Sequence, residues 1–212
     1  MSRILFPALI LVATMNPTTA SAQATAAREY VREVRELATT GAVREAFRII
    51  EGLDAWAVER LVELNEIPAP PFMEEARGRR FADLLAECGA DSVWTDSEGN
   101  VFGLRRGRRG ERIVALGAHL DTVFPEGTDV TVRQRGDTLF APGIGDDTRG
   151  LVVVLAVLRA MKEAGIRTGD DIVFVGVVGE EGLGDLRGMK HIYRDPDEGP
   201  DAWIEVDGGG LA

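Results

Sequence analysis

The chain has 212 residues, of which 45% are hydrophobic and 28% are charged, and this is the composition of a globular protein. The formal net charge of −11 argues against a nucleic-acid partner, because an acidic body repels a phosphate backbone. The single cysteine, Cys88, can form neither an intramolecular disulfide nor a thiolate zinc site. Any metal must therefore be held by histidine and carboxylates.

The first 22 residues are typical of a cleavable secretory signal. Arg3 precedes an apolar run from Ile4 to Ala13, and Ala20-Ser21-Ala22 follows after a polar stretch. A membrane anchor is the alternative, but a helix needs about 20 apolar residues to span a bilayer. We expect cleavage after Ala22, a secreted or periplasmic protein, and no membrane association once the signal is removed.

Residues 23–66 form a predicted helical segment, because their apolar residues recur at helical spacing. Gly41 and Gly52 divide this segment into two or three helices. A proline-rich stretch then precedes another amphipathic helix, predicted from about Phe72 to Cys88. Its arginines are expected mostly on the solvent side; they are Arg77, Arg79 and Arg80.

The pattern then changes to strands. Ser92–Thr95 and Val101–Arg105 predict a hairpin, and two nearly continuous apolar runs predict strands that are buried on both faces. The runs are Arg112–Ala118 and Asp171–Val178. A long helix is expected between them, from about Asp147 to Ala164, and a last strand at Ala202–Val206. This alternation predicts that residues 67–212 form all or part of an α/β domain, with a central, mostly parallel sheet and helices on both faces.

Four polar clusters follow the apolar runs, where ligands bind in open α/β sheets. The clusters are His119-Leu120-Asp121, Gly145-Asp146-Asp147, Gly179-Glu180-Glu181-Gly182 and Asp207-Gly208-Gly209. In the first, Asp121 lies two residues from His119 and therefore on the same side of an extended chain, where its carboxylate can orient the imidazole as a metal ligand. A capped loop with a surface histidine explains that cluster equally well, and Asp146 alone could be a helix N-cap.

Glu180 and Glu181 are the most informative pair. Two adjacent carboxylates beside a buried strand repel each other, and a divalent cation relieves that repulsion. One glutamate could bind metal while the other takes a proton from a metal-activated water. Two solvated glutamates in a loop are the alternative.

Together these segments resemble the dizinc exopeptidase family that contains peptidase T, glutamate carboxypeptidase and aminoacylase. The resemblance runs from about Leu61 to the last residue, and four motifs in the family's order carry it. They are His119-Leu120-Asp121-Thr122-Val123-Phe124, Ala141-Pro142-Gly143-Ile144-Gly145-Asp146-Asp147, Val178-Gly179-Glu180-Glu181-Gly182 and Val206-Asp207-Gly208-Gly209.

The resemblance implies a centre that binds two Zn²⁺ ions, with Co²⁺ or Mn²⁺ as possible replacements. It implies that His119 and Asp207 bind one ion, that Glu181 binds the other, and that Asp146 bridges both. Glu180 would be the general base and Asp121 would orient His119, with a cis peptide between Asp146 and Asp147. The implied reaction is metal-dependent hydrolysis of an amide bond in a short peptide or an N-acyl amino acid.

One part of the family pattern is missing. The family's second zinc also needs a histidine that lies beyond an inserted lid domain, and no such segment occurs in this sequence. His191 is the other histidine, and we interpret it as an ordinary surface or core residue. We therefore expect the chain to be an incomplete catalytic domain without its lid, and a homodimer only if the full protein has that lid. The alternative is an inactive fragment or a non-catalytic module that binds peptide or metal.

Overall fold

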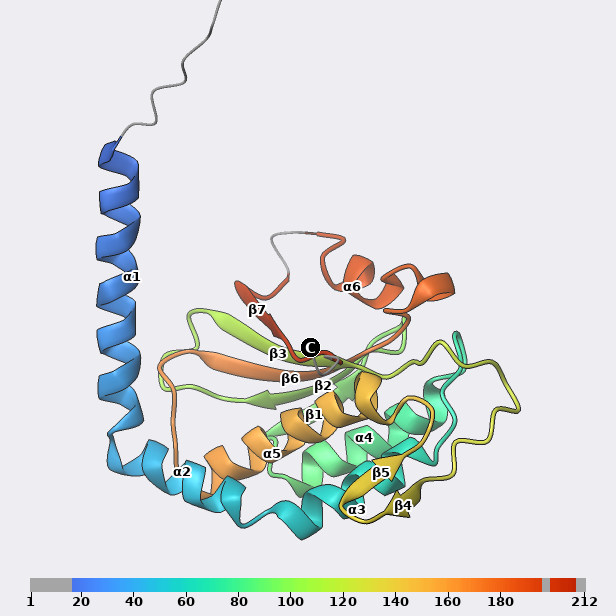
Figure 1. Cartoon of the computed structure of the whole chain (residues 1–212). Coiled ribbons are helices and arrows are strands. Elements are labelled where there is room, and N and C mark those ends of the chain that lie inside the picture. The colour runs from blue at the N-terminus through green and yellow to red at the C-terminus, as the bar shows by residue number, and fades with distance from the viewer. Residues whose placement is uncertain (1–16, 196–198, 209–212) are drawn as a thin grey trace, which may run out of the picture. The chain divides into compact units, whose positions relative to one another are not determined.

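The computed structural model describes residues 17–195 and 199–208, and the chain divides into two units, Met1–Thr40 and Gly41–Ala212 (Figure 1). The first unit contains helix α1 (Pro17–Ala38). The predicted cleavage point after Ala22 falls within α1, while residues 1–16 of the predicted signal lie outside the described part. No helix in the described ranges is both long and apolar enough to cross a bilayer.

The second unit begins with three helices, α2 (Gly41–Glu51), α3 (Asp54–Asn65) and α4 (Glu75–Glu87). Helices α2 and α3 confirm the helical periodicity read before residue 66. The helix predicted from Phe72 starts later, because Phe72 has a positive φ of 67° and the chain turns there. Helix α4 ends before Gly89, whose φ of +96° suits glycine better than a residue with a side chain.

A five-stranded sheet forms the centre of this unit. Its strands lie in the order β1-β2-β6-β3-β7, and their bounds are β1 (Ser92–Thr95), β2 (Val101–Arg105), β3 (Ile113–His119), β6 (Asp171–Val177) and β7 (Ala202–Glu205). β3 pairs in parallel with β6 and β7, whereas β2 runs antiparallel to both β1 and β6. Four of these five strands thus point the same way, which confirms a mostly parallel sheet.

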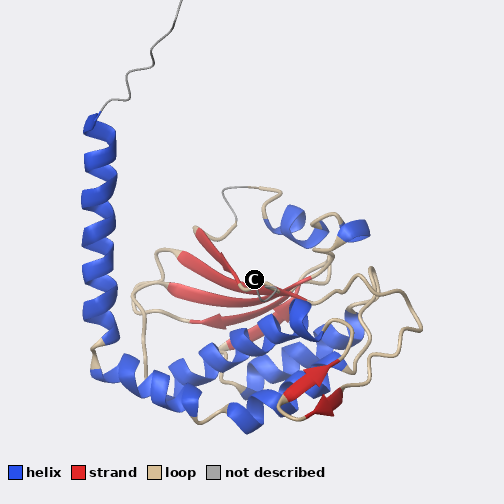
Figure 2. Cartoon of the chain, viewed as in Figure 1, coloured by secondary structure: helices blue, strands red, loops and turns tan. Residues whose placement is uncertain are grey.

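Helices cover both faces of the sheet (Figure 2). The main core lies between the sheet and helices that include α4 and α5 (Arg149–Glu163), around fully buried residues such as Phe81, Leu155 and Phe174. Each such side chain stabilises the fold by about 1.5–3 kcal/mol through burial. On the other face, Met189 and Ile192 of the short helix α6 (Arg187–Ile192) pack against a smaller cluster that contains Val175.

Two further features differ from the sequence-based expectations. A small hairpin formed by β4 (Arg133–Arg135) and β5 (Thr138–Phe140) was not predicted, because its strands are too short and polar to show an alternating pattern. The prediction that Arg77 faces solvent is wrong. Arg77 is fully buried in α4, and its guanidinium donates to the carbonyls of Ile67, Leu120 and Asn65 at 3.0, 2.9 and 3.4 Å.

Candidate metal centre

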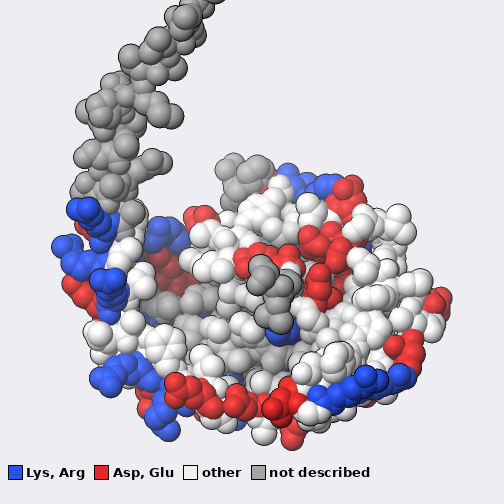
Figure 3. All heavy atoms as spheres, viewed as in Figure 1, with Lys and Arg blue, Asp and Glu red and all other residues white. Residues whose placement is uncertain are grey.

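The four predicted clusters lie together at the carboxyl ends of the parallel strands. His119 is the last residue of β3, Glu180 and Glu181 follow β6, and Asp207 follows β7. Asp146 lies in the turn that precedes α5. Figure 3 shows acidic side chains gathered near the middle of the viewed face. Parallel strands end at one edge of a sheet, which is why residues almost 90 positions apart meet here.

His119 is the buried centre of this cluster, with 1% of its surface exposed. Its Nδ1 lies 3.0 Å from the backbone carbonyl of Asp121. Because a carbonyl oxygen only accepts, Nδ1 must carry the proton, and in the neutral ring Nε2 keeps its lone pair. Nε2 faces two carboxylates, with Asp146 Oδ1 at 3.0 Å and Asp207 Oδ1 at 3.7 Å.

The carboxylate of Asp121 contacts the loop after β6 as well as His119. One oxygen lies 3.6 Å from His119 Nδ1, which is too long for a good hydrogen bond. The two oxygens accept the backbone N–H groups of Glu180 and Glu181, each at 2.9 Å. Asp121 therefore connects the end of β3 to the loop after β6, and it holds that loop as well as the imidazole.

Asp146 and Asp147 have different roles, and the peptide bond between them is cis. Asp147 is fully buried; it accepts the N–H of His119 at 3.1 Å and that of Gly150 at 3.0 Å. The carboxylate that accepts an amide from the first turn of α5 is thus Asp147, so the N-cap alternative for Asp146 is wrong. The side chain of Asp146 remains 55% exposed and is directed at His119.

Asp207 approaches this group at the end of β7. The N–H of Val206 still donates to the Gly117 carbonyl at 2.8 Å, so β3 aligns the chain up to the residue before Asp207. Gly208 follows because a Cβ there would lie 2.5 Å from the Asp146 Cβ. Gly209, the last residue of the predicted motif, lies outside the described residues.

Burial and like charges dominate the electrostatics of the site. Burial alone would lower the pKa of His119, but Asp121, Asp147 and Asp146 outweigh it and raise this pKa to about 10. Burial raises the pKa of Asp147 to about 7 and also raises the pKa of both Glu180 and Glu181, with further increases from neighbouring carboxylates. A group of carboxylates with raised pKa around one imidazole is an environment that a divalent cation stabilises.

The donor atoms fit a small divalent cation. Among the described residues, two sets each offer ligand atoms within 4.8 Å of one another: His119, Asp147 and Asp207, and His119, Glu180 and Glu181. An imidazole nitrogen with carboxylate oxygens suits zinc, cobalt or manganese. The structure brings all of the predicted ligands to this edge, and those ligands are His119, Asp146, Glu181 and Asp207.

Sequence reasoning gave no separate role to Asp147, because it forms one motif with Asp146 and a single sequence does not show which of two adjacent aspartates faces inward. His191 lies elsewhere, as predicted. Its Nε2 is 3.5 Å from Ser97 Oγ and 3.8 Å from Asp96 Oδ2.

Beside the centre lies a cleft of about 370 Å³, whose walls include Val123, Phe124 and Ile144 as well as Asp146 and Glu181.

The chain is similar to known peptidases in sequence and in fold. Residues 115–210 match the model of "Peptidase family M20/M25/M40". Carboxypeptidase G2 of Pseudomonas sp. (strain RS-16) is 37% identical over 70 residues, which cover 32% of this chain and 17% of that protein. The present chain thus spans about a sixth of that relative.

Two solved structures show the same fold at low identity. Human carnosine dipeptidase 1 has a TM-score of 0.65 at 14% identity, over 82% of this chain and 42% of that one. The aminopeptidase PepT from Bacillus cereus has a TM-score of 0.61 at 22% identity, over 73% and 43%. The family match begins at residue 115, inside β3, and includes all four clusters of the centre. Over residues 115–210, the chain is therefore similar to the Peptidase family M20/M25/M40, in agreement with the resemblance that the sequence motifs indicate.

Proposed function

We propose that this chain is the metal-binding part of a peptidase that hydrolyses the amide bond of a short peptide or an N-acyl amino acid. The observation that carries the proposal is the convergence of three other segments on His119. Oxygens of Asp146 and Asp207 lie 3.0 and 3.7 Å from its Nε2, and Glu180 and Glu181 offer ligand atoms within 4.8 Å of the imidazole. The cleft beside Asp146 and Glu181 leaves room there for a substrate.

His119, Asp146, Glu181 and Asp207 would hold the metal, and two Zn²⁺ ions are the expected occupancy, with Co²⁺ or Mn²⁺ as substitutes. When bound, the metal acts as a Lewis acid that polarises the scissile carbonyl and lowers the pKa of water. The protein contributes fixed donors. Asp121 and Asp147 hold the amides of Glu180, Glu181 and His119, so these donors are positioned by the backbone.

Glu180 is the proposed general base. Its backbone N–H is fixed by Asp121, and burial raises the pKa of its carboxyl toward the range in which a base both accepts and releases a proton. In this scheme the Glu180 carboxylate takes a proton from the attacking water and delivers it to the leaving amine. A module that only binds peptide would need no general base.

The test uses Glu180→Gln, which removes the base but keeps the shape, with Glu59→Gln on the exposed side of α3 as the control. Turnover should fall by about 10²–10⁴-fold in Glu180→Gln and remain unchanged in Glu59→Gln. Zn²⁺ affinity, measured by titration calorimetry, should stay within a few-fold of wild type. Equal peptide binding with no turnover in either wild type or Glu180→Gln would instead identify a non-catalytic module.

The substrates for this assay follow from the relatives, which are named as a carboxypeptidase, an aminopeptidase and a dipeptidase. A dipeptide, its N-acylated form and its C-terminal amide separate these three activities. If the C-terminal amide is cleaved but the N-acylated form is not, the enzyme requires a free amino terminus on its substrate. If the N-acylated form is cleaved but the C-terminal amide is not, it requires a free carboxylate.

We also propose that the protein is exported and cleaved after Ala22. The charge, apolar run and small residues within 1–22 support this proposal. Amino-terminal sequencing of the protein from its own cell envelope or medium should begin at Gln23. A mature protein that begins at Met1 or Ser2 would contradict it.

A further inference from the structure

The loop that carries Glu180 and Glu181 is closed at its base by backbone hydrogen bonds. It leaves the sheet at Val178 and returns at Gly188, whose N–H donates to the Val178 carbonyl at 3.0 Å. The N–H of Arg187 donates to the Gly179 carbonyl at 3.1 Å. Asn100 bridges the base as well, since it accepts from Val178 N at 3.0 Å and donates to the Gly188 carbonyl at 3.2 Å.

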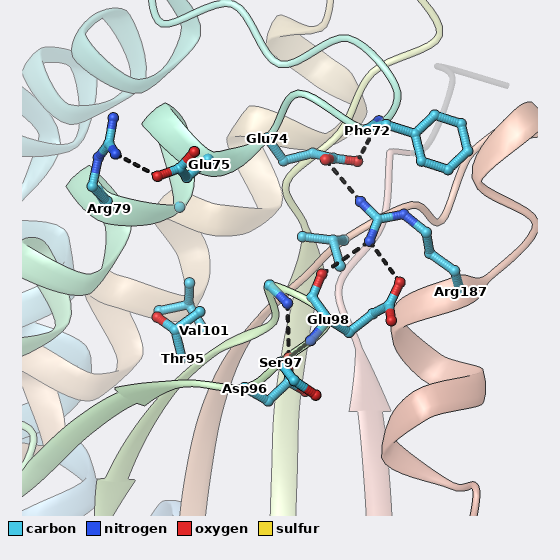
Figure 4. Close-up of a pocket in the computed structure, with 13 residues that line it drawn as sticks. Phe72, Glu74, Glu75, Arg79, Thr95, Asp96, Ser97, Glu98, Val101 and Arg187 are labelled. Atoms are coloured by element: carbon cyan, nitrogen blue, oxygen red, sulfur yellow. Dashed lines mark hydrogen bonds and ion pairs between the residues drawn. The ribbon is translucent and has the colours of Figure 1, made fainter.

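The Arg187 side chain extends from this base toward two other elements (Figure 4). One guanidinium nitrogen donates to Glu74 Oε2 at 2.8 Å, and the other donates to both Glu98 Oε1 and the Glu98 carbonyl at 3.0 Å. Glu74 directly precedes α4 and is 97% buried, and Glu98 lies in the turn between β1 and β2. The guanidinium also lies 5.2 Å from the centre of the Phe72 ring. Arg187 therefore ties the loop to two separate parts of the domain.

The arginine stem lies directly against the residue before Glu180. A Cβ at Gly179 would lie 2.6 Å from both Cγ and Nε of Arg187, and Gly179 has a φ of +62°. Both the close approach and the positive φ require glycine. The backbone that leads into Glu180 is thus held between the Arg187 stem on one side and, through the Glu180 amide, Asp121 on the other.

We propose that Arg187 is a positioning residue, which fixes the Glu180 carboxylate relative to His119 by clamping Gly179 against Glu74 and Glu98. This inference rests on the proposed role of Glu180. Arg187 contacts none of the predicted ligands in the structure, so it acts through the loop. A planar guanidinium bonds two carboxylates at fixed angles, and a lysine ammonium does not reproduce that geometry.

The expected effect is on turnover more than on binding. A displacement of about 1 Å in a catalytic group can reduce turnover by about 100-fold. Arg187→Gln should therefore lower kcat by about 10–100-fold and leave KM within about twofold. Arg187→Lys should recover only part of that loss. Arg79→Ala is the matched control, because Arg79 lines the same 330 Å³ pocket but pairs with Glu75 at the surface.

Two measurements do not depend on turnover. Hydrogen exchange of the amides at 179–184 should be faster in Arg187→Gln than in wild type and unchanged in Arg79→Ala. The visible absorption of bound Co²⁺ should shift in Arg187→Gln. If wild type binds Co²⁺ but hydrolyses no peptide, the proposed function fails. Hydrogen exchange and Co²⁺ absorption would still test whether Arg187 positions the loop.

The proposal is overturned if a folded Arg187→Gln variant keeps kcat, exchange and the Co²⁺ spectrum of wild type. It is also overturned if Arg187→Lys and Arg187→Gln lose the same factor in kcat and both unfold at the same lowered Tm. That pattern would mean that Arg187 contributes only to the stability of the fold. Should Arg187→Gln not fold, Glu98→Gln weakens one of the two carboxylate contacts. It is then expected to show a smaller kcat loss with the same faster exchange.

Discussion

The candidate metal centre has a buried half and an exposed half. His119, Asp121 and Asp147 are at most 1% exposed, and the carboxylates of Asp121 and Asp147 each accept two backbone amides. The side chains of Asp146 and Asp207 are 55% and 56% exposed, and the polar contact that they share is His119 Nε2.

The two halves differ in what holds their carboxylates in place. The buried carboxylates accept hydrogen bonds from the fold itself, so their positions are part of the folded structure. The exposed carboxylates both face the His119 imidazole, and a cation is what would hold them there. Removal of a buried group should therefore lower the free energy of unfolding as well as metal affinity, whereas removal of an exposed group should affect metal binding alone.

The largest effect is expected for Asp121→Ala. It leaves the amides of Glu180 and Glu181 without an acceptor and should lower the free energy of unfolding by about 3 kcal/mol. Urea denaturation in EDTA measures this loss without any contribution from metal. Asp121→Asn keeps one acceptor oxygen, so its free energy of unfolding should lie between those of wild type and Asp121→Ala. Equal stability of wild type and Asp121→Ala would contradict the structural role of the buried half.

Metal addition should stabilise wild type by a similar amount. A cation at 100 times its Kd adds about 2.7 kcal/mol to the free energy of unfolding, provided that it binds the folded state alone. Thermal denaturation with Zn²⁺ and with EDTA measures this difference. Asp207→Ala should show a much smaller response to Zn²⁺. An identical response in both proteins would exclude Asp207 as a ligand.

Arg77→Met tests a support of the buried half. Arg77 donates to the carbonyl of Leu120, between His119 and Asp121, and its replacement leaves the carbonyls of Leu120, Asn65 and the half-buried Ile67 without that donor. Methionine restores the apolar volume, so the expected loss is about 2 kcal/mol of unfolding free energy. Arg79→Met on the exposed side of the same helix is the control. A change no larger than in this control would show that the carbonyls find other donors.

The smallest effect belongs to the exposed half. In EDTA, Asp207→Ala should change the free energy of unfolding by less than about 0.5 kcal/mol, since surface substitutions rarely exceed that range. A slight stabilisation is expected, because one of several like charges is removed. The same urea titration as for Asp121→Ala measures it. A loss that approaches that of Asp121→Ala would remove the distinction between the two halves.

Most of the fold could be predicted because its hydrophobic periodicity is strong. The strands β1 and β2 have the predicted bounds, β6 and β7 each end one residue before the predicted end, and β3 is shifted by one residue at both ends. The β4–β5 hairpin escaped prediction because three-residue polar strands carry no such signal. The burial of Arg77 was missed for a related reason, since helical spacing places a side chain on a face but does not show which carbonyls the loops direct toward it.

The sequence by itself determined the α/β layers and the grouping of histidine and carboxylates after the strands, because local periodicity and strand direction determine both. Only the tertiary structure decided which aspartate of Asp146-Asp147 supports α5 and which faces His119. It also decided that Asp121 holds the loop of Glu180 and that Arg187 reaches Glu74, 113 residues away. These contacts join segments far apart in the chain, and they exist only once the sheet has brought the segments together.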